Sequence, residues 1–172
     1  MHIGMGTRQF VFCQKQQNMN DKMQAAIRSG DTAALTEILE EHPEWVDQPD
    51  ERGFRPLVLA TYLQQPEIAT LLLEKGANIN ARDGAGNTAL MGVVFKGDKG
   101  LTALLIDKGA SINLQNYSGA TALIYAVSYG HHDIVRLLIE KGADQNAIDR
   151  EGKTARDHAK DKQDTAMMEL LG

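Results

Sequence analysis

Three short segments near the C-terminus contain residue types that could carry chemistry. Residues 152–154, Gly-Lys-Thr, match the end of a phosphate-binding loop, whose backbone N–H groups and lysine surround phosphate oxygens. Residues 131–133, His-His-Asp, are side chains that ligate transition metals. His158 stands next to Asp157, and both are residue types used in general acid and base catalysis. What each segment can do depends on the element that positions it.

The spacing around these segments argues against a reaction or a bound ion. A phosphate-binding loop needs an earlier glycine, and Ala147 occupies that position. Adjacent residues of a helix point in different directions, whereas metal ligands on one helix are three or four residues apart. No motif places a serine or cysteine nucleophile near His158. We therefore predict no enzyme activity, no catalytic residue, no cofactor and no metal site.

A 33-residue period supplies the elements that hold these segments. Each period opens with a glycine: Gly53, Gly86, Gly119 and Gly152. Near copies of Leu-Leu-Ile-Glu-Lys-Gly-Ala then follow at residues 71–77, 104–110 and 137–143. A turn and two helices repeated at this length indicate stacked repeats that share one core. The period also accounts for the glycines of 83–86 and 152–154, which otherwise hint at nucleotide loops.

Residue types within each period predict where the helices begin and end. Thr88, Thr121 and Thr154 are placed to cap the first helix of a repeat, and Pro56 suits a first helical position. A glycine follows the lysine that ends each second helix, where a left-handed residue closes the turn. These glycines are Gly76, Gly109 and Gly142.

These motifs resemble the ankyrin repeat family, from about Met19 to the end of the chain. The resemblance implies an all-α solenoid of stacked helix-turn-helix units with short β-turn or hairpin loops, about five repeats including divergent caps. We expect a flexible leader at 1–18, whose origin is left open, and a single repeat domain at 19–172. The domain divides into a cap repeat at 19–49, repeats at 50–82, 83–115 and 116–148, and a C-terminal cap at 149–172.

The two ends and one signature position depart from the repeat pattern. In the first repeat we expect Asp31 to cap the second helix and Pro43 to stop it, with Trp45 covering the core. In the last copy Arg156 and Asp157 replace apolar residues, which predicts a face that ends at water. The histidine of the family's Thr-Pro-Leu-His signature is also replaced, which puts its usual hydrogen bonds in doubt. Its substitutes are Val58, Met91 and Ile124.

Composition excludes several classes of partner and site. The chain has 172 residues, a formal net charge of −5 and 42% hydrophobic residues, as expected for one globular domain. The acidic balance argues against binding nucleic acid or an anionic membrane surface. Cys13 is the only cysteine, which excludes an internal disulfide and a multi-cysteine zinc site. The apolar run at 10–13 is too short for a secretory signal or a membrane span, so we expect a cytoplasmic protein.

The resemblance also implies where a partner protein would bind. In ankyrin proteins, contacts commonly come from the turn tips and from the exposed side of the first helix. Carried onto this chain, those places give Arg52, Phe54, Tyr62, Leu63, Arg82, Asn87, Phe95, Lys96, Gln115, Tyr117, Ser128 and Tyr129. Five of the eight Phe and Tyr residues of the chain fall in this set. Large rings dominate interface hot spots, so we interpret them as a binding face.

The sequence thus predicts a non-catalytic scaffold that grips a partner protein in a concave groove. We expect alanine at Phe95 or Tyr129 to weaken partner capture with little loss of thermal stability. Three alternatives stay open. The rings pack laterally as spacers between repeats, or the protein handles a ligand or cofactor such as haem for a partner enzyme. The third is that the protein is not strictly monomeric and associates weakly with itself through an imperfect cap.

Overall fold

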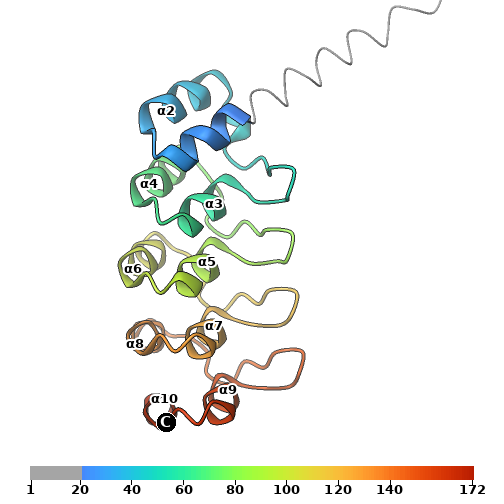
Figure 1. The fold of residues 1–172 in the computed structure, drawn as a ribbon, viewed down its shortest axis with the longest axis vertical. Helices are drawn as coiled ribbons and strands as arrows, with labels where there is room; N and C mark the ends of the chain where they lie inside the picture. The colour runs from blue at the N-terminus through green and yellow to red at the C-terminus, as the bar shows by residue number, and fades with distance from the viewer. Residues whose placement is uncertain (1–20) are drawn as a thin grey trace, which may run out of the picture.

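The computed structural model describes residues 21–172, so the predicted leader and the first two residues of the cap repeat lie outside it. Within this range the chain forms helix pairs stacked in one direction, with a first row of helices beside a second row (Figure 1). Helical residues 21–29 and α2 (Thr32–Glu41) form the N-terminal pair. The following pairs are α3 (Pro56–Tyr62) with α4 (Pro66–Glu74), α5 (Ala89–Lys96) with α6 (Lys99–Asp107), α7 (Ala122–Ser128) with α8 (His132–Glu140), and α9 (Ala155–Asp161) with α10 (Thr165–Leu170). This arrangement confirms the predicted all-α solenoid.

Helix starts follow the predicted capping residues. The side chains of Thr88, Thr121 and Thr154 each accept a hydrogen bond from a backbone N–H in the first turn of α5, α7 and α9. Pro56 occupies the first position of α3, and Asp31 caps α2. The three glycines after the second helices have φ angles near 90°, so they are left-handed as predicted.

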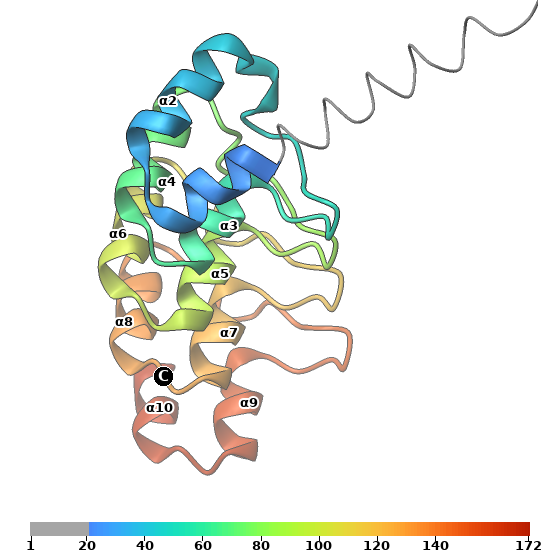
Figure 2. The same ribbon diagram turned by 45° about the horizontal axis from the view of Figure 1, so that its top comes forward.

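The loops between repeats project from the same side of the stack, and Figure 2 shows them lying above one another. Each opening glycine lies in a turn closed by a backbone hydrogen bond, for example from Gly86 N to Asp83 O at 2.9 Å. Arg82 and Thr88 form an antiparallel β-bridge across one such loop. The expected hairpin-like loops therefore hold the first helices in register without a β-strand in residues 21–172.

The hydrophobic core runs along the stack between the two rows. Leu72, Leu105 and Leu138 occupy equivalent places in α4, α6 and α8, and each is 0% exposed. The first helices contact one another in the order α3, α5, α7 and α9. Each repeat therefore buries apolar surface against its neighbours as well as within its own helix pair.

The two ends of the stack differ from the internal repeats, as predicted. α2 ends before Pro43, which begins the short 3-10 helix η1 (Pro43–Trp45), and the buried Trp45 ring stacks on His42 with centroids 4.0 Å apart. At the other end Arg156 and Asp157 are exposed. The C-terminal pair thus presents polar side chains where the internal repeats present apolar ones.

A ladder of side chains also joins successive repeats, and we call it the inter-repeat ladder. In each rung a side-chain oxygen near the start of one loop accepts a hydrogen bond from a backbone N–H of the next repeat. The rungs run from Asn78 N to Asp47, from Ser111 N to Asn80, and from Asp144 N to Asn113, at 2.8 to 3.1 Å. Since these bonds recur at equivalent positions, they fix the spacing of the repeats.

Candidate functional site

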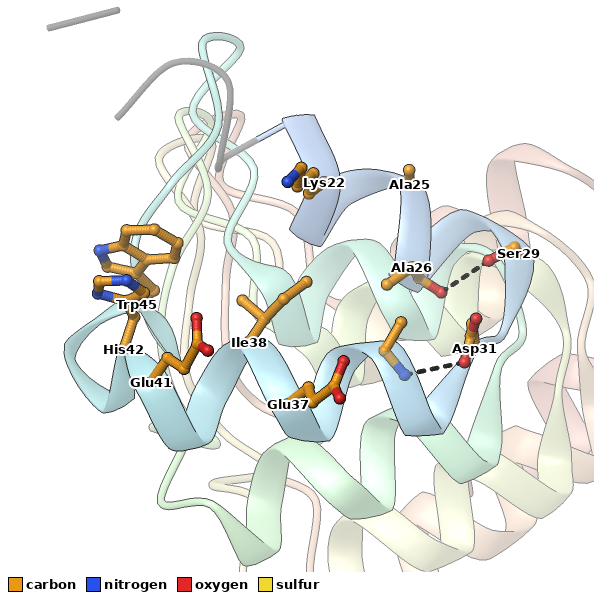
Figure 3. A pocket seen from close by; sticks show the side chains of 11 residues that line it. Lys22, Ala25, Ala26, Ser29, Asp31, Glu37, Ile38, Glu41, His42 and Trp45 are labelled. Atoms are coloured by element: carbon orange, nitrogen blue, oxygen red, sulfur yellow. Dashed lines mark hydrogen bonds between the residues drawn. The ribbon is translucent and has the colours of Figure 1, made fainter. Parts of the chain in front are cut away.

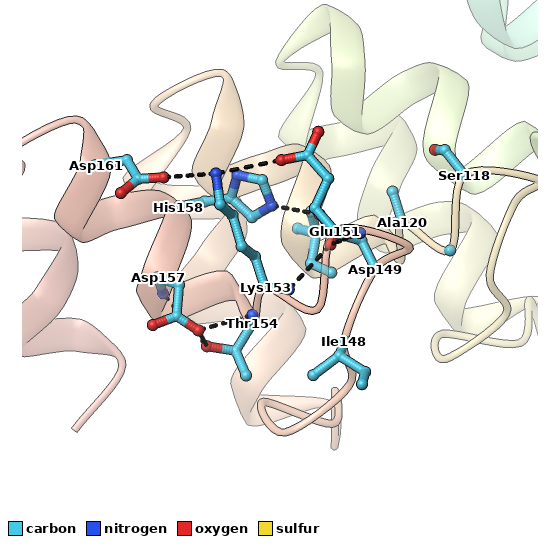
Figure 4. Close-up of polar contacts among 12 residues, drawn as sticks. Ser118, Ala120, Ile148, Asp149, Glu151, Lys153, Thr154, Asp157, His158 and Asp161 are labelled. Atoms are coloured by element: carbon cyan, nitrogen blue, oxygen red, sulfur yellow. Dashed lines mark hydrogen bonds and ion pairs between the residues drawn. The ribbon is translucent and has the colours of Figure 1, made fainter.

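The Gly-Lys-Thr segment has structural roles in the C-terminal cap (Figure 4). Gly152 N donates to Asp149 O in the loop turn, and Thr154 caps α9. The Lys153 ammonium lies 2.9 Å from Asp161 and 3.2 Å from Glu151. Hydrogen bonds to Asp161 and then Glu151 raise the pKa of Lys153. These contacts agree with the repeat interpretation of the segment.

The neighbouring histidines 131 and 132 point to different repeats. His131 Nε2 lies 3.3 Å from the carbonyl oxygen of Phe95 in the preceding repeat. His132 Nε2 lies 3.1 Å from a carboxylate oxygen of Asp164 in the following one. Across residues 21–172, no three His, Cys, Asp or Glu side chains are grouped so that they could hold a metal ion. The two rings instead link α8 to both neighbours.

His158 pairs with Asp149 rather than with its sequence neighbour Asp157. The distance from His158 Nε2 to Asp149 Oδ2 is 2.7 Å, and the Asp149 side chain is only 9% exposed. Burial opposes ionisation of Asp149, but hydrogen bonds from the Lys153 backbone, His158 and the Glu151 backbone outweigh it and lower the pKa. Asp157 instead completes the cap of α9 with Thr154. The His158–Asp149 pair therefore fastens the last loop to α9.

Acid should loosen this attachment. Because the pKa of Asp149 is lower in the folded than in the unfolded protein, its stabilising effect is present above the unfolded value, near 3.9, and is lost as pH falls through the folded value. Urea unfolding at a series of pH values should show a shallower acid loss of stability for Asp149→Asn than for wild type. Asn116 occupies the equivalent loop position one repeat earlier, so asparagine suits this turn. Equal acid slopes for the two proteins would contradict the expectation.

A cleft of about 320 Å³ lies along α3, α5 and α7, and we call it the aromatic cleft. Its lining residues are Phe54, Val58, Tyr62, Asp83, Ala85, Asn87, Met91, Gly92, Phe95, Tyr125 and Tyr129. Gly92 is the α5 equivalent of Leu59 in α3 and Tyr125 in α7, because 33 residues separate each pair. Because glycine has no side chain, this position of α5 leaves part of the cleft unfilled.

The rings of the cleft contact one another across repeats. The ring centroids of Tyr62 and Phe95 are 6.3 Å apart in a stacked arrangement, and Phe95 meets Tyr129 edge to face at 4.7 Å. Tyr129 also lies 6.0 Å from Tyr125. Lys96 extends over Tyr62, with its ammonium 3.9 Å from the ring centroid. Such ring pairs stabilise the stack and leave the exposed faces of the tyrosines on the surface.

Polar contacts hold the floor of the aromatic cleft. The Tyr125 hydroxyl donates to Asn87 Oδ1 at 3.1 Å, and Asn116 Nδ2 donates to the same oxygen at 2.8 Å. Asn87 Nδ2 in turn donates to Asp83 Oδ2 at 3.2 Å. Burial is the main cause that raises the pKa of Tyr125, and the negative charge of the Asp83 carboxylate adds to it. The floor is therefore a fixed network with a negative carboxylate at its edge.

Five of the residues that the sequence places on the binding face come together in this cleft: Phe54, Tyr62, Asn87, Phe95 and Tyr129. Lys96 joins them through its contact with Tyr62. Sequence reasoning left Val58, Asp83, Met91, Gly92 and Tyr125 out of the site. The repeat register could have pointed to two of these residues. Gly92 and Tyr125 occupy the position that Leu59 has in an earlier repeat, where glycine has no side chain and tyrosine has a larger one.

Other members of the sequence-derived set lie outside the aromatic cleft. Arg82 donates to the carbonyl of Gln115, and Gln115 donates to the carbonyl of Ile148, so both side chains bridge successive loops. Arg52 is exposed at a loop tip. Leu63, at the end of α3, packs partly against the core.

Tyr117 and Ser128 also lie apart from the aromatic cleft. Tyr117 is 55% exposed and rests on the loop at Gly86. Ser128 lines a second cleft of about 300 Å³, which shares Tyr125 and Tyr129 with the first and continues toward Asp149. The two clefts therefore share this tyrosine pair in their lining.

Another groove, of about 500 Å³, lies at the N-terminal end of the stack (Figure 3). It runs between helical residues 21–29 and α2, with Ile38 and Trp45 in its wall and Lys22 and Glu41 at its border. The sequence gave no reason to expect a groove there. Its position at the end of the stack separates it from the predicted binding face.

Comparisons with known proteins agree with the helical repeat architecture. A family model described as ankyrin repeats (3 copies) matches residues 8–83 and 81–149. The chain is 36% identical over 73 residues to M-phase phosphoprotein 8 of Mus musculus, and 36% identical over 75 residues to ankyrin repeat and SAM domain-containing protein 6 of Rattus norvegicus. These matches cover 42% and 43% of this chain but 8% of each relative. No helix in residues 21–172 is long and apolar enough to span a membrane. The family match over most of the chain, together with the stacked helix pairs, shows that this protein belongs to the ankyrin repeat family.

Proposed function

We propose that the protein is a non-catalytic scaffold that binds a partner protein, with the aromatic cleft at the centre of the binding surface. Ankyrin repeats are in general protein–protein interaction modules. The cleft has the chemistry of an interface core, because rings and aliphatic side chains form most of its walls. A cleft of this kind can receive a protruding side chain of the partner.

The observation that carries the proposal is the exposure of large rings beside a cleft. In the described part of the chain, the exposed large apolar side chains are Tyr62, Tyr117, Tyr129 and Ile148. Two of them, Tyr62 and Tyr129, border the aromatic cleft and are 43% and 51% exposed. Rings that also pack laterally are held in place before binding, so a partner meets them at little cost in side-chain entropy.

Because the rings pack on one another, the expected effect of alanine at Phe95 changes. The Phe95 side chain is half-buried between the rings of Tyr62 and Tyr129. Alanine at Phe95 should therefore destabilise the stack as well as weaken binding. Tyr62 and Tyr129 are the better probes of the surface.

Tyr62→Ala and Tyr129→Ala should each weaken partner binding, by about 2 kcal/mol if the ring is a hot spot. The partner is first identified by affinity capture with the wild-type protein and mass spectrometry. Its affinity for each variant is then measured by surface plasmon resonance, and urea unfolding checks that the variant remains folded.

Tyr117→Ala is the matched control, because this tyrosine is similarly exposed but lies outside the aromatic cleft. It should retain binding. If Tyr117→Ala loses as much affinity as the two cleft variants, or if the cleft variants lose none, the cleft is not the centre of the interface.

A further inference from the structure

We propose that the aromatic cleft receives a basic side chain of the partner, preferably an arginine. The inference rests on the proposed function and adds the chemistry of the group that enters. It follows from three features of the cleft: ring faces, a carboxylate at its edge and a lysine of the chain itself lying over one ring.

The carboxylate is that of Asp83. Among the described residues that line the aromatic cleft, Asp83 alone carries a formal charge. Its Oδ1 accepts hydrogen bonds from the backbone N–H groups of Ala85 and Asn87 at 2.9 and 2.8 Å, which hold the side chain in one orientation. A carboxylate has about four acceptor positions, so Asp83 can still accept a donor from a guanidinium group.

The ring faces already hold a cation. Lys96 is exposed, yet its ammonium lies 3.9 Å from the centroid of Tyr62 and 5.8 Å from that of Phe95. This is the geometry of a cation–π contact, which is worth little energy at an exposed site and is easily exchanged. Lys96 thus acts as an internal occupant that a partner cation replaces.

Arginine fits these groups better than lysine does. Its planar guanidinium can stack on a tyrosine or phenylalanine ring while its N–H groups bond a carboxylate at the edge. The formal net charge of −5 also favours approach of a basic segment. An acidic partner side chain would instead pair with Lys96, but it would meet the carboxylate of Asp83 at the cleft. If the entering side chain is basic, removing the Lys96 charge should strengthen its binding. If it is acidic, the same change should weaken its binding.

The test is an NMR titration of the 15N-labelled protein with N-acetyl-arginine-N-methylamide, and with the leucine and glutamate analogues as matched controls. We expect saturable amide shifts around residues 83–96 and 125–129 for the arginine compound, with a dissociation constant on the order of millimolar. The leucine compound should bind more weakly, and the glutamate compound should give no saturable shifts.

Two variants test whether the charges around the aromatic cleft favour a bound cation. Asp83→Asn should weaken binding of the arginine compound by about three- to fivefold, and Lys96→Gln should strengthen it by about twofold. Asn116 fills the same turn position one repeat later, so asparagine is compatible with the fold. Asp50→Asn is the control, because Asp50 makes the same turn contacts one repeat earlier and does not line the cleft.

The inference is overturned if the arginine compound gives no saturable shifts, if leucine binds equally well, or if Lys96→Gln weakens binding. Any of these results leaves the scaffold function standing, provided that Tyr62→Ala and Tyr129→Ala still release the captured protein. Conversely, arginine binding combined with unchanged partner capture in the two tyrosine variants would overturn the proposed interface and retain the cation site.

Discussion

Gly119→Ala should lower the free energy of unfolding by about 3 kcal/mol, whereas Gly142→Ala should lower it by only about 1 kcal/mol. Both glycines are left-handed, with φ angles of 78° and 89°. A methyl group at Gly119 would lie 2.9 Å from both Arg150 N and Asp149 Cα in the next loop. At Gly142 it would meet no atom within 4 Å. The first substitution therefore adds a backbone clash to the conformational strain that the two share.

Urea unfolding followed by circular dichroism measures the difference between these variants. The clash at Gly119 involves backbone atoms, and Arg150 N also donates to Ser118 O across the same two loops. Relief would thus require the last loop to move away and break this contact. Equal losses in the two variants would show that the loops do not pack as closely as the distances indicate.

Leu105→Ala should be similarly damaging, with a loss of about 3 kcal/mol. The side chain is 0% exposed in the centre of the stack, between the equivalent leucines Leu72 and Leu138. Removing it leaves a cavity that neighbouring helices can fill only partly. Because repeats are stabilised by their neighbours, the loss should weaken the stack on both sides of α6.

The adjacent Leu104 provides the matched control for this substitution. It belongs to the same helix and residue type but is only partly buried. Leu104→Ala should cost about 1 kcal/mol, in proportion to the apolar area it hides. Thermal unfolding of both variants by calorimetry compares them directly. A Leu104 variant as unstable as the Leu105 variant would place the core on the wrong face of α6.

The repeat fold could be predicted from sequence because its determinants are local and recur. A threonine that caps a helix, as at Thr121, and a glycine that must be left-handed, as at Gly109, each act within a few residues. Repetition at one period then gives the same signal several times. The helix pairs, their capping residues and the polar C-terminal end of the stack could therefore be inferred from the sequence alone.

The aromatic cleft was harder to predict because it depends on side chains from different repeats. Phe95 belongs to the exposed side of its helix, yet the neighbouring rings half-bury it. Tyr125 points inward and still reaches the cleft floor through its hydroxyl group. Arg82 and Gln115 are on the loops, but the close stacking of the loops brings backbone carbonyls within their reach. Such contacts depend on how the repeats pack, which a linear pattern does not specify.

The inter-repeat ladder has a consequence for how such a protein changes in evolution. Every rung joins residues 31 positions apart, and equivalent rungs follow at intervals of 33. Duplication or loss of one whole internal unit in the gene therefore preserves the remaining rungs and creates a matching new one at the junction. The molecule can grow or shrink in steps without redesign of either end. Its reach along a partner can thus evolve separately from the residues that make contact.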